Sequence, residues 1–422
     1  MKEFFNFMNE SVTAFHAVKN VEDTLKKASF SLLSEDKSWN ISGDKGFFVK
    51  RNSSSLIAFK MPKGEAKGFK IFAAHTDSPC FRIKENTEII FNDKAVRLNV
   101  EKYGGMILSS WLDRPLSVAG RVVVNEKNQL KEKLVNIDKD LLIIPNVAIH
   151  MNRDINDGFK YSVQNDMLPL FGGKDAKGKF AELIAKAAGT KKENVLAFDL
   201  FLYSREKAKY AGVSDDFIVS PRLDDLACVY SGMQGFLESD DSDYVKVLAL
   251  FDNEEVGSGT KQGADSTFLY DVLKRISLSL SKAKSEKEED FLRLVASSFL
   301  VSADNAHAVH PAAAGKADVT NRPFLNEGVV IKYNGNQRYA TDAYSSAFFK
   351  KICQDNKIPF QVFCNNSDIA GGSTLGNIST AHVSLNTVDI GLPQYAMHSS
   401  CETMGSADLK YMIDFAKSFY GE

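Results

Sequence analysis

The sequence predicts an α/β fold with a β-rich insertion, and three observations support this prediction. Up to about residue 87, apolar runs such as 68–74 end in polar residues, which is typical of buried strands that carry functional side chains to a sheet edge. Between about 87 and 217, short alternating runs follow one another and polar loops separate them. After Pro221, buried-strand and helical patterns alternate again. We therefore expect a discontinuous α/β domain at 1–86 and 218–422, and an inserted β-rich domain at 87–217.

The elements expected along the chain follow from the spacing of apolar residues. Helical spacing, with the Ser11 or Thr13 hydroxyl available as a cap, predicts a first helix over 11–27. Short runs bounded by turn residues predict strands, and longer runs at helical spacing predict helices. The charged segment 282–290 is expected to be a solvated helix face or loop. The expected strands are 53–61, 68–74, 96–100, 121–125, 141–149, 195–203, 245–251, 299–302, 328–333, 360–364 and 387–390, and the further helices are 180–188, 224–236, one from 266 into the 270s, 342–356, 373–379 and 406–419.

Composition limits the classes of partner. The chain has 422 residues and a formal net charge of -2, so its charge does not indicate nucleic-acid or anionic-membrane binding. No apolar run approaches the ~20 residues of a membrane-spanning helix, and the N-terminal residues make a poor signal peptide. The five cysteines are scattered without a CxxC pair, which favours buried thiols in a reducing compartment. We expect a cytoplasmic enzyme.

The segment 247–266 is the centre of the functional prediction. The apolar run 245–251 is followed by Glu254 and Glu255 and then by a Gly-Ser-Gly turn. Two adjacent glutamates at the end of a buried strand repel each other, so they need a cation, or one of them must hold a proton. The pattern therefore indicates a metal site at a strand end.

Other candidate ligands also follow strands or turns. His75 and Asp77 lie two residues apart after a predicted strand, so Asp77 could hold the second N–H of a metal-binding His75, although a structural pair is the simpler alternative. Asp224 could bridge two ions, but alone it is better explained as a helix N-cap. Asp304 follows an apolar strand and His398 an apolar turn. Each of these residues is weak evidence alone.

Together the candidates define a chemistry. They offer nitrogen and carboxylate oxygen without thiolate, which suits Zn²⁺, Mn²⁺ or Co²⁺ in a hydrolytic site. Other catalytic motifs have no support, because the chain contains no GxSxG, no Walker A sequence, no GxGxxG after a strand and no HExxH.

Six motifs stand in order along the chain: AAHTDSP (73–79), SPRLDDL (220–226), FDNEEVGS (251–258), SADNAHAVHP (302–311), NQRYATDA (336–343) and DIGLPQYAMHS (389–399). Together they resemble the aspartyl aminopeptidase family of dinuclear metallo-aminopeptidases. The resemblance extends over nearly the whole chain and implies a mixed-sheet α/β metallopeptidase catalytic domain with an inserted β-rich dimerisation domain.

The resemblance also implies a role for each candidate ligand. His75 and Asp304 would hold one metal ion, Glu255 and His398 the other, and Asp224 would bridge the two. Two divalent ions per subunit are expected, with Zn²⁺ first and Mn²⁺ or Co²⁺ as alternatives.

Further roles follow from the same resemblance. Glu254 would be the general base, and Asp77 would orient His75. His307, His310 and Lys332 resemble substrate-contacting or site-proximal positions. In the family, the counterpart of His150 reaches the active site of a neighbouring subunit, and dimers assemble into a dodecamer. The chain departs from the usual pattern at Asp225, where the family usually has Asn.

The expected function is metal-dependent removal of N-terminal residues from peptides. A metal-activated water would attack, Glu254 would move its proton, and Lys332 could pair with an acidic side chain, although a solvated strand lysine is the simpler explanation of Lys332 alone. The alternatives are an aminopeptidase with a neutral preference, a related amide hydrolase or deacylase, and an assembly protein that has lost the chemistry. We expect no nucleic-acid or membrane partner and a homo-oligomer.

Overall fold

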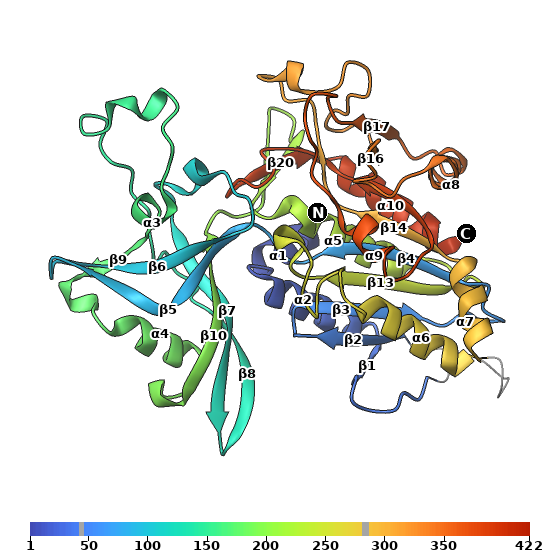
Figure 1. Cartoon of the computed structure of the whole chain (residues 1–422), viewed down its shortest axis with the longest axis horizontal. Helices are drawn as coiled ribbons and strands as arrows, with labels where there is room; N and C mark the ends of the chain where they lie inside the picture. The colour runs from blue at the N-terminus through green and yellow to red at the C-terminus, as the bar shows by residue number, and fades with distance from the viewer. Residues whose placement is uncertain (42–45, 281–286) are drawn as a thin grey trace. The chain divides into compact units, whose positions relative to one another are not determined.

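The computed structural model describes residues 1–41, 46–280 and 287–422, which form two compact units (Figure 1). The first unit comprises Met1–Asp77, Ala208–Met397 and Glu402–Glu422, and the second comprises Ser78–Lys207 with His398–Cys401. The second unit therefore starts and ends about ten residues earlier than the insertion drawn from the sequence at 87–217. Its first strand begins as early as Cys80.

The first unit is built on a mixed sheet of nine strands, as predicted for an α/β fold. Their order is β1-β2-β3-β13-β4-β14-β18-β16-β17. The central strands β13, β4, β14 and β18 are mutually parallel, while β3 and β16 run antiparallel to their central neighbours. The carboxyl ends of the four central strands therefore meet at one edge, where ligands bind in sheets of this kind. The strands are β1 (Ser31–Leu33), β2 (Phe47–Arg51), β3 (Ser55–Lys60), β4 (Phe69–His75), β13 (Val245–Phe251), β14 (Phe299–Ala303), β16 (Val329–Tyr333), β17 (Phe360–Cys364) and β18 (Asn386–Gly391).

Helices cover both faces of this sheet. Along β4, Phe72 and Ala74 pack into one hydrophobic cluster while Ile71 and Ala73 pack into the other, because side chains alternate across a strand. Such two-sided burial explains why these strands are nearly continuous apolar runs. The first cluster includes residues of α1 (Lys2–Glu10), α2 (Ala14–Lys27), α5 (Leu223–Glu238), α8 (Ala343–Asp355) and α10 (Asp408–Gly421), and the second includes residues of α6 (Phe268–Leu280), α7 (Lys287–Ala296) and α9 (Leu375–Ser379).

A smaller sheet of five strands completes the first unit. Its order is β11-β12-β20-β19-β15, and β20 pairs antiparallel with both of its neighbours. This sheet places β12, which precedes α5, beside β20, which follows β19. The strands are β11 (Lys209–Ala211), β12 (Phe217–Ser220), β15 (Ala306–His307), β19 (Pro393–Tyr395) and β20 (Glu402–Gly405).

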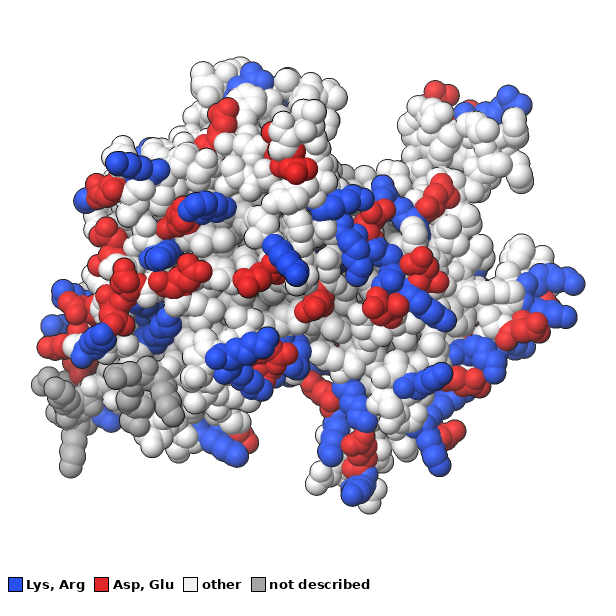
Figure 2. Space-filling view, turned by 180° about the vertical axis from the view of Figure 1, so that it is seen from behind, with Lys and Arg blue, Asp and Glu red and all other residues white. Residues whose placement is uncertain are grey.

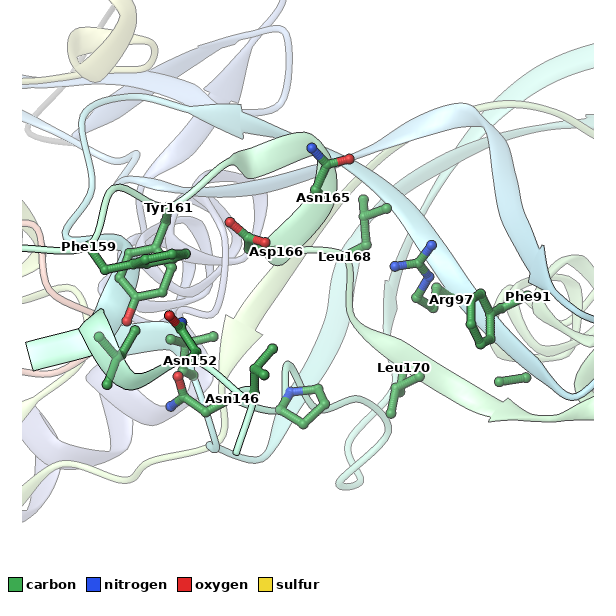
Figure 3. Close-up of a pocket in the computed structure, with 15 residues that line it drawn as sticks. Phe91, Arg97, Asn146, Asn152, Phe159, Tyr161, Asn165, Asp166, Leu168 and Leu170 are labelled. Carbon is green, nitrogen blue, oxygen red and sulfur yellow. The ribbon is translucent and has the colours of Figure 1, made fainter. Parts of the chain in front are cut away.

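The second unit is an antiparallel sheet of six strands with its own hydrophobic core. Its strand order is β8-β7-β10-β5-β6-β9. A cavity of about 490 Å³ lies beside β6 and β9, and Figure 3 shows Phe159 and Tyr161 at one end of it and Arg97 and Phe91 at the other. The elements are β5 (Cys80–Phe91), β6 (Ala95–Tyr103), β7 (Leu116–Glu126), β8 (Gln129–Asn136), β9 (Leu170–Gly173), β10 (Val195–Ser204), α3 (Val163–Asp166) and α4 (Lys179–Ala187).

Most predicted elements are present with ends shifted by a few residues. The predicted strand 141–149 is wrong, because only Leu142 and Ile143 form isolated bridges there. Pro145 has no N–H to donate to a ladder, which explains why the alternating pattern does not form a strand. Of the charged segment, 282–286 lie outside the described residues and 287–290 begin α7.

The described surface carries both signs of charge. On the face in Figure 2, Lys and Arg side chains are interspersed with Asp and Glu side chains. Among the described residues, no helix combines the length and apolarity needed to cross a membrane.

Candidate metal centre

The two adjacent glutamates lie in a tight turn after β13. Asn253, with φ 63°, leads into a 3₁₀ turn over Glu254–Val256, and Gly257, with φ 95°, ends it. A φ of this sign is easily adopted by glycine and rarely by other residues. The backbone N–H of Ser258 closes the turn on the carbonyl oxygen of Asn253 at 2.7 Å. The turn therefore places both glutamates at the carboxyl end of the central strands.

Asp77 holds this turn against β4. One oxygen of its buried carboxylate accepts the backbone N–H of Glu254 and the other accepts that of Glu255, each at 3.2 Å. The same carboxylate lies 3.4 Å from Nδ1 of His75. The backbone carbonyl oxygen of Asp77 lies 3.1 Å from the same nitrogen. Asp77 thus contacts the ring of His75 and also holds the backbone of Glu254 and Glu255.

Asp224 and Asp225 lie at the start of α5, where their backbone is not helical. Asp224 Oδ1 is 3.5 Å from His75 Nε2. Asp225 is fully buried and accepts the backbone N–H of His75 through Oδ2 at 3.2 Å. The preceding Arg222 anchors the loop, since its guanidinium donates to the carbonyl oxygens of Ser11 and Met8.

Asp304 follows β14 directly. Its backbone N–H donates to the carbonyl oxygen of Ile390 in β18 at 3.0 Å. Gly391 follows Ile390, and a Cβ atom at position 391 would lie 2.0 Å from the carbonyl oxygen of Asp304. The backbones can therefore approach each other this closely only with glycine at that position. Lys332 Nζ is 3.8 Å from Asp304 Oδ1.

These residues form two groups that could each hold a metal ion. Potential ligand atoms of His75, Asp224, Asp225 and Asp304 all lie within 4.8 Å of one another, and those of His75, Glu254 and Glu255 do so as well. The donors are imidazole nitrogen and carboxylate oxygen, which suit Zn²⁺ and related divalent ions. The residue types and their convergence therefore fit the expected cofactor.

The electrostatics of the cluster show an excess of buried negative charge. Burial raises the pKa of Glu254 to about 8, although the nearby His75 opposes the shift. Burial likewise raises the pKa values of Asp225 and Asp304. For His75, burial favours a lower pKa, but Asp224 and Asp77 outweigh it and raise the pKa well above its usual value. A bound cation would offset this concentration of carboxylates.

The remaining predicted residues are distributed over both units. In the first unit, His307 and His310 are exposed and Lys332 is almost fully buried. In the second unit, His150 is exposed in an irregular loop. His398 belongs to the second unit, where its Nδ1 lies 2.6 Å from the carbonyl oxygen of Gly105.

Comparisons with known proteins identify the family of the chain. The family profile described as "Aminopeptidase I zinc metalloprotease (M18)" matches residues 7–420. The chain belongs to this family of zinc aminopeptidases. It is therefore an aminopeptidase of the M18 type, which confirms the resemblance seen in the sequence.

Individual M18 relatives match over almost the whole chain. The "Probable M18 family aminopeptidase 2" of Clostridium acetobutylicum is 46% identical over 427 residues, covering 99% of this chain and 98% of its own length. The cryo-EM structure of the Ape4 and Nbr1 complex matches with a TM-score of 0.95 at 36% identity, covering 99% of this chain and 85% of that one. The mApe1 dodecamer of S. cerevisiae matches with a TM-score of 0.87 at 26% identity, covering 99% and 95%.

Sequence reasoning did not identify the buried residues that support this M18 site. Asn305, Gln394 and Glu402 are each at most 2% exposed. The sequence contains one signal for such a residue. Glu402 lies two residues before the apolar Met404, so in a strand both side chains would be on the same, buried face. That strand, β20, was not predicted.

Proposed function

We propose that the chain removes acidic N-terminal residues from peptides with the help of two divalent metal ions. The observation that carries this proposal is the convergence of His75, Asp304, Glu254 and Glu255 at the carboxyl ends of β4, β14 and β13 with Asp224 at the start of α5. The M18 membership supports zinc and aminopeptidase chemistry. In the proposed arrangement His75 and Asp304 would hold one ion, Glu255 and His398 would hold the other, and Asp224 would be a ligand shared by both.

The role of His398 is supported by its own geometry. A metal-binding histidine commonly donates its second N–H to a carbonyl or carboxylate oxygen, and Nδ1 of His398 lies 2.6 Å from the Gly105 carbonyl oxygen. Its φ is 66°, in the left-handed region that non-glycine residues adopt infrequently. Both features suit a ligand that binds through Nε2.

Glu254 is the proposed general base. Divalent ions at such a site lower the pKa of a bound water and polarise the carbonyl that is attacked. Glu254 takes the proton of the attacking water and passes it to the leaving amine. Its backbone N–H is fixed by Asp77 while its carboxylate lies among the candidate ligands, which supports a positioned proton carrier.

Lys332 is the proposed recognition group for an acidic side chain. Its ammonium donates to the carbonyl oxygen of Asn305 at 3.1 Å, and an ammonium has three donors. The ring of Tyr339 lies 5.4 Å from Nζ. A buried cation beside the ligand Asp304 could therefore pair with one substrate carboxylate. His307 and His310, which ring contacts hold near Phe363 and Tyr395, are proposed to contact the substrate.

The second unit is the proposed assembly surface. Its irregular loop exposes Val147, Ile149 and Met151 around His150, and the adjoining cavity is lined by Phe159 and Tyr161 (Figure 3). Clustered exposed apolar side chains indicate a protein interface. We propose that a second copy covers them, that His150 serves a neighbouring subunit, and that dimers build a dodecamer like that of mApe1.

One experiment tests the central proposal. Purified protein is stripped of metal with a chelator, reloaded with Zn²⁺, Mn²⁺ or Co²⁺, and assayed on aspartyl, glutamyl and leucyl chromogenic amides and on N-acyl amino acids. Two ions per chain and a preference for the acidic amides are expected. Activity on N-acyl amino acids alone would identify a deacylase instead, and a leucyl preference would remove the acidic specificity. Gel filtration that gave only monomer would contradict the assembly and the role of His150.

A further inference from the structure

One peptide group at the metal centre is held from both sides by buried side chains. The carbonyl oxygen of Leu223 accepts a hydrogen bond from Asn305 Nδ2 at 2.8 Å, and the N–H of Asp224 donates to Glu402 Oε2 at 3.0 Å. This carbonyl and this N–H belong to the same planar unit. The two contacts therefore fix the plane that immediately precedes Asp224.

The two side chains that hold this plane are linked to each other. Asn305 Nδ2 also donates to Gln394 Oε1 at 2.9 Å, and Gln394 Nε2 reaches Glu402 Oε1 at 3.5 Å. Asn305 and Glu402 are 2% exposed and Gln394 is 1% exposed. The contacts form a closed ring, which we call the Asp224 clamp, made of Asn305, Gln394, Glu402 and the Leu223–Asp224 peptide. A buried polar network whose members find partners is rigid.

Asn305 connects the clamp to Asp304 through the chain itself, and two further contacts hold Asn305 in place. Asn305 follows Asp304 directly, and its own carbonyl oxygen accepts from Lys332 Nζ at 3.1 Å. Its Oδ1 accepts from Cys228 Sγ at 3.2 Å. Through Asn305, the clamp ties the backbone beside one candidate ligand, Asp304, to the backbone beside another, Asp224.

We propose that Asn305 and Glu402 are positioning residues of the dinuclear centre, which orient Asp224 and Asp304 through the clamp. This inference rests on the proposed metal site. A carboxylate that bridges two ions must present both oxygens in fixed directions, and functional constellations tolerate errors of only about 0.5 Å. A turn of the Leu223–Asp224 plane would move the Asp224 carboxylate away from one ion. Supporting residues of this kind commonly change metal affinity about 10- to 100-fold.

The test compares three substitutions in the full-length protein. Glu402→Leu removes the acceptor for the Asp224 N–H, and Asn305→Ala removes the donor to the Leu223 carbonyl. Each is expected to weaken Zn²⁺ affinity, measured by chelator competition, at least about tenfold. Glu402→Gln keeps an oxygen that can accept from the Asp224 N–H and loses only the long 3.5 Å contact with Gln394 Nε2, so it is expected to retain affinity within about threefold of the parent. The visible spectrum of the Co²⁺-loaded protein should shift for the first two variants, because it reports ligand geometry.

Asp408 offers a matched control. It is fully buried like Glu402 and accepts the backbone N–H groups of Asn326 and Gly328, at 2.7 and 3.0 Å, but it is in none of the candidate metal groups. Asp408→Leu should lower the melting temperature of the metal-free protein without changing Zn²⁺ affinity. If the clamp served only stability, Glu402→Leu would likewise lower the melting temperature and leave Zn²⁺ affinity unchanged.

The outcomes separate this inference from the proposed function. If the parent binds two Zn²⁺ ions and Asp224→Ala releases them, but Glu402→Leu and Asn305→Ala keep parental affinity and spectrum, the clamp inference alone is overturned. Should Glu402→Leu fail to fold, Asn305→Ala gives the same decision. If the parent itself binds no Zn²⁺, or Asp224→Ala binds Zn²⁺ as tightly as the parent, the proposed metal site itself is contradicted, and the clamp inference with it.

Discussion

The Asp77 carboxylate is the support whose removal gives the clearest prediction. Asp77→Asn preserves the shape of the side chain, but only one of its two terminal atoms can still accept a hydrogen bond. In the native chain, one oxygen accepts from the N–H of Glu254 and the other from that of Glu255. In the variant, an amide NH₂ must face one of these N–H groups. The turn that carries both glutamates should therefore shift.

The size of the effect follows from the bond that is lost. A hydrogen bond to a charged group contributes about 1.5–3 kcal/mol. Since 1.36 kcal/mol corresponds to a factor of ten in rate, about 10- to 100-fold of kcat should be lost. His75 also loses the carboxylate that lies 3.4 Å from its Nδ1, so Zn²⁺ affinity should fall as well.

The assay is hydrolysis of an aspartyl chromogenic amide by Zn²⁺-loaded protein, with the melting temperature measured in parallel. Asp408→Asn is the control, because Asp408 is also buried and also accepts two backbone N–H groups. Both variants should be less stable, and only Asp77→Asn should lose turnover. The reasoning is refuted if Asp77→Asn keeps kcat within about threefold of the parent, or if Asp408→Asn loses as much.

Three further predictions concern the base, the specificity and the pH dependence. Glu254→Gln should keep both metal ions and lose roughly 10²- to 10⁴-fold of kcat, the usual contribution of a general base; full turnover would remove the assignment. Lys332→Met should reduce the preference for aspartyl over leucyl amides at least about tenfold, since a buried charge-assisted pair is lost, and an unchanged ratio would contradict the proposed pairing. Burial and the nearby Arg222 lower the pKa of His16 to about 4 from 6.5. The unfolded chain therefore binds this proton more readily, and the free energy of unfolding of the metal-free protein should rise between pH 4 and 6.5 by at most about 3 kcal/mol. His16→Gln should flatten that rise. If the free energy of unfolding rose equally with pH in both proteins, the role of His16 would be disproved.

The sequence was sufficient for the strands that carry the candidate ligands. The run Val245–Phe251 is β13 without a shift at either end, because a strand buried on both faces is apolar at nearly every position, here at all except Lys246. The adjacent β4, and β14 on the far side of β4, have the same character, so His75 and Asp304 could be placed at strand ends from residue type alone. Which glutamate binds metal could not be decided that way and depended on the family resemblance.

The supports could not be predicted, because their partners are backbone groups far away in the chain. Asn305 contacts the carbonyl oxygen of Leu223, 82 positions away, and Glu402 contacts the N–H of Asp224, 178 positions away. No local pattern encodes a contact of this kind. The boundary of the second unit could not be predicted for a related reason. Ser78 belongs to this unit because of its spatial contacts, which the composition of the sequence does not reveal.

The supports that accept backbone N–H groups of the ligands share one physical feature that explains why the site suits cations. The backbone N–H of His75 is held by Asp225, those of Glu254 and Glu255 by Asp77, and that of Asp224 by Glu402. Each support is a buried carboxylate, so the groups that fix the ligands add negative charge to ligands that are themselves mostly anionic. Charge of one sign in a buried site is unfavourable unless a counter-charge offsets it. Lys332 supplies part of that counter-charge, and two divalent ions would supply the remainder. The same carboxylates that give the backbone its fixed geometry therefore also give the site its need for metal.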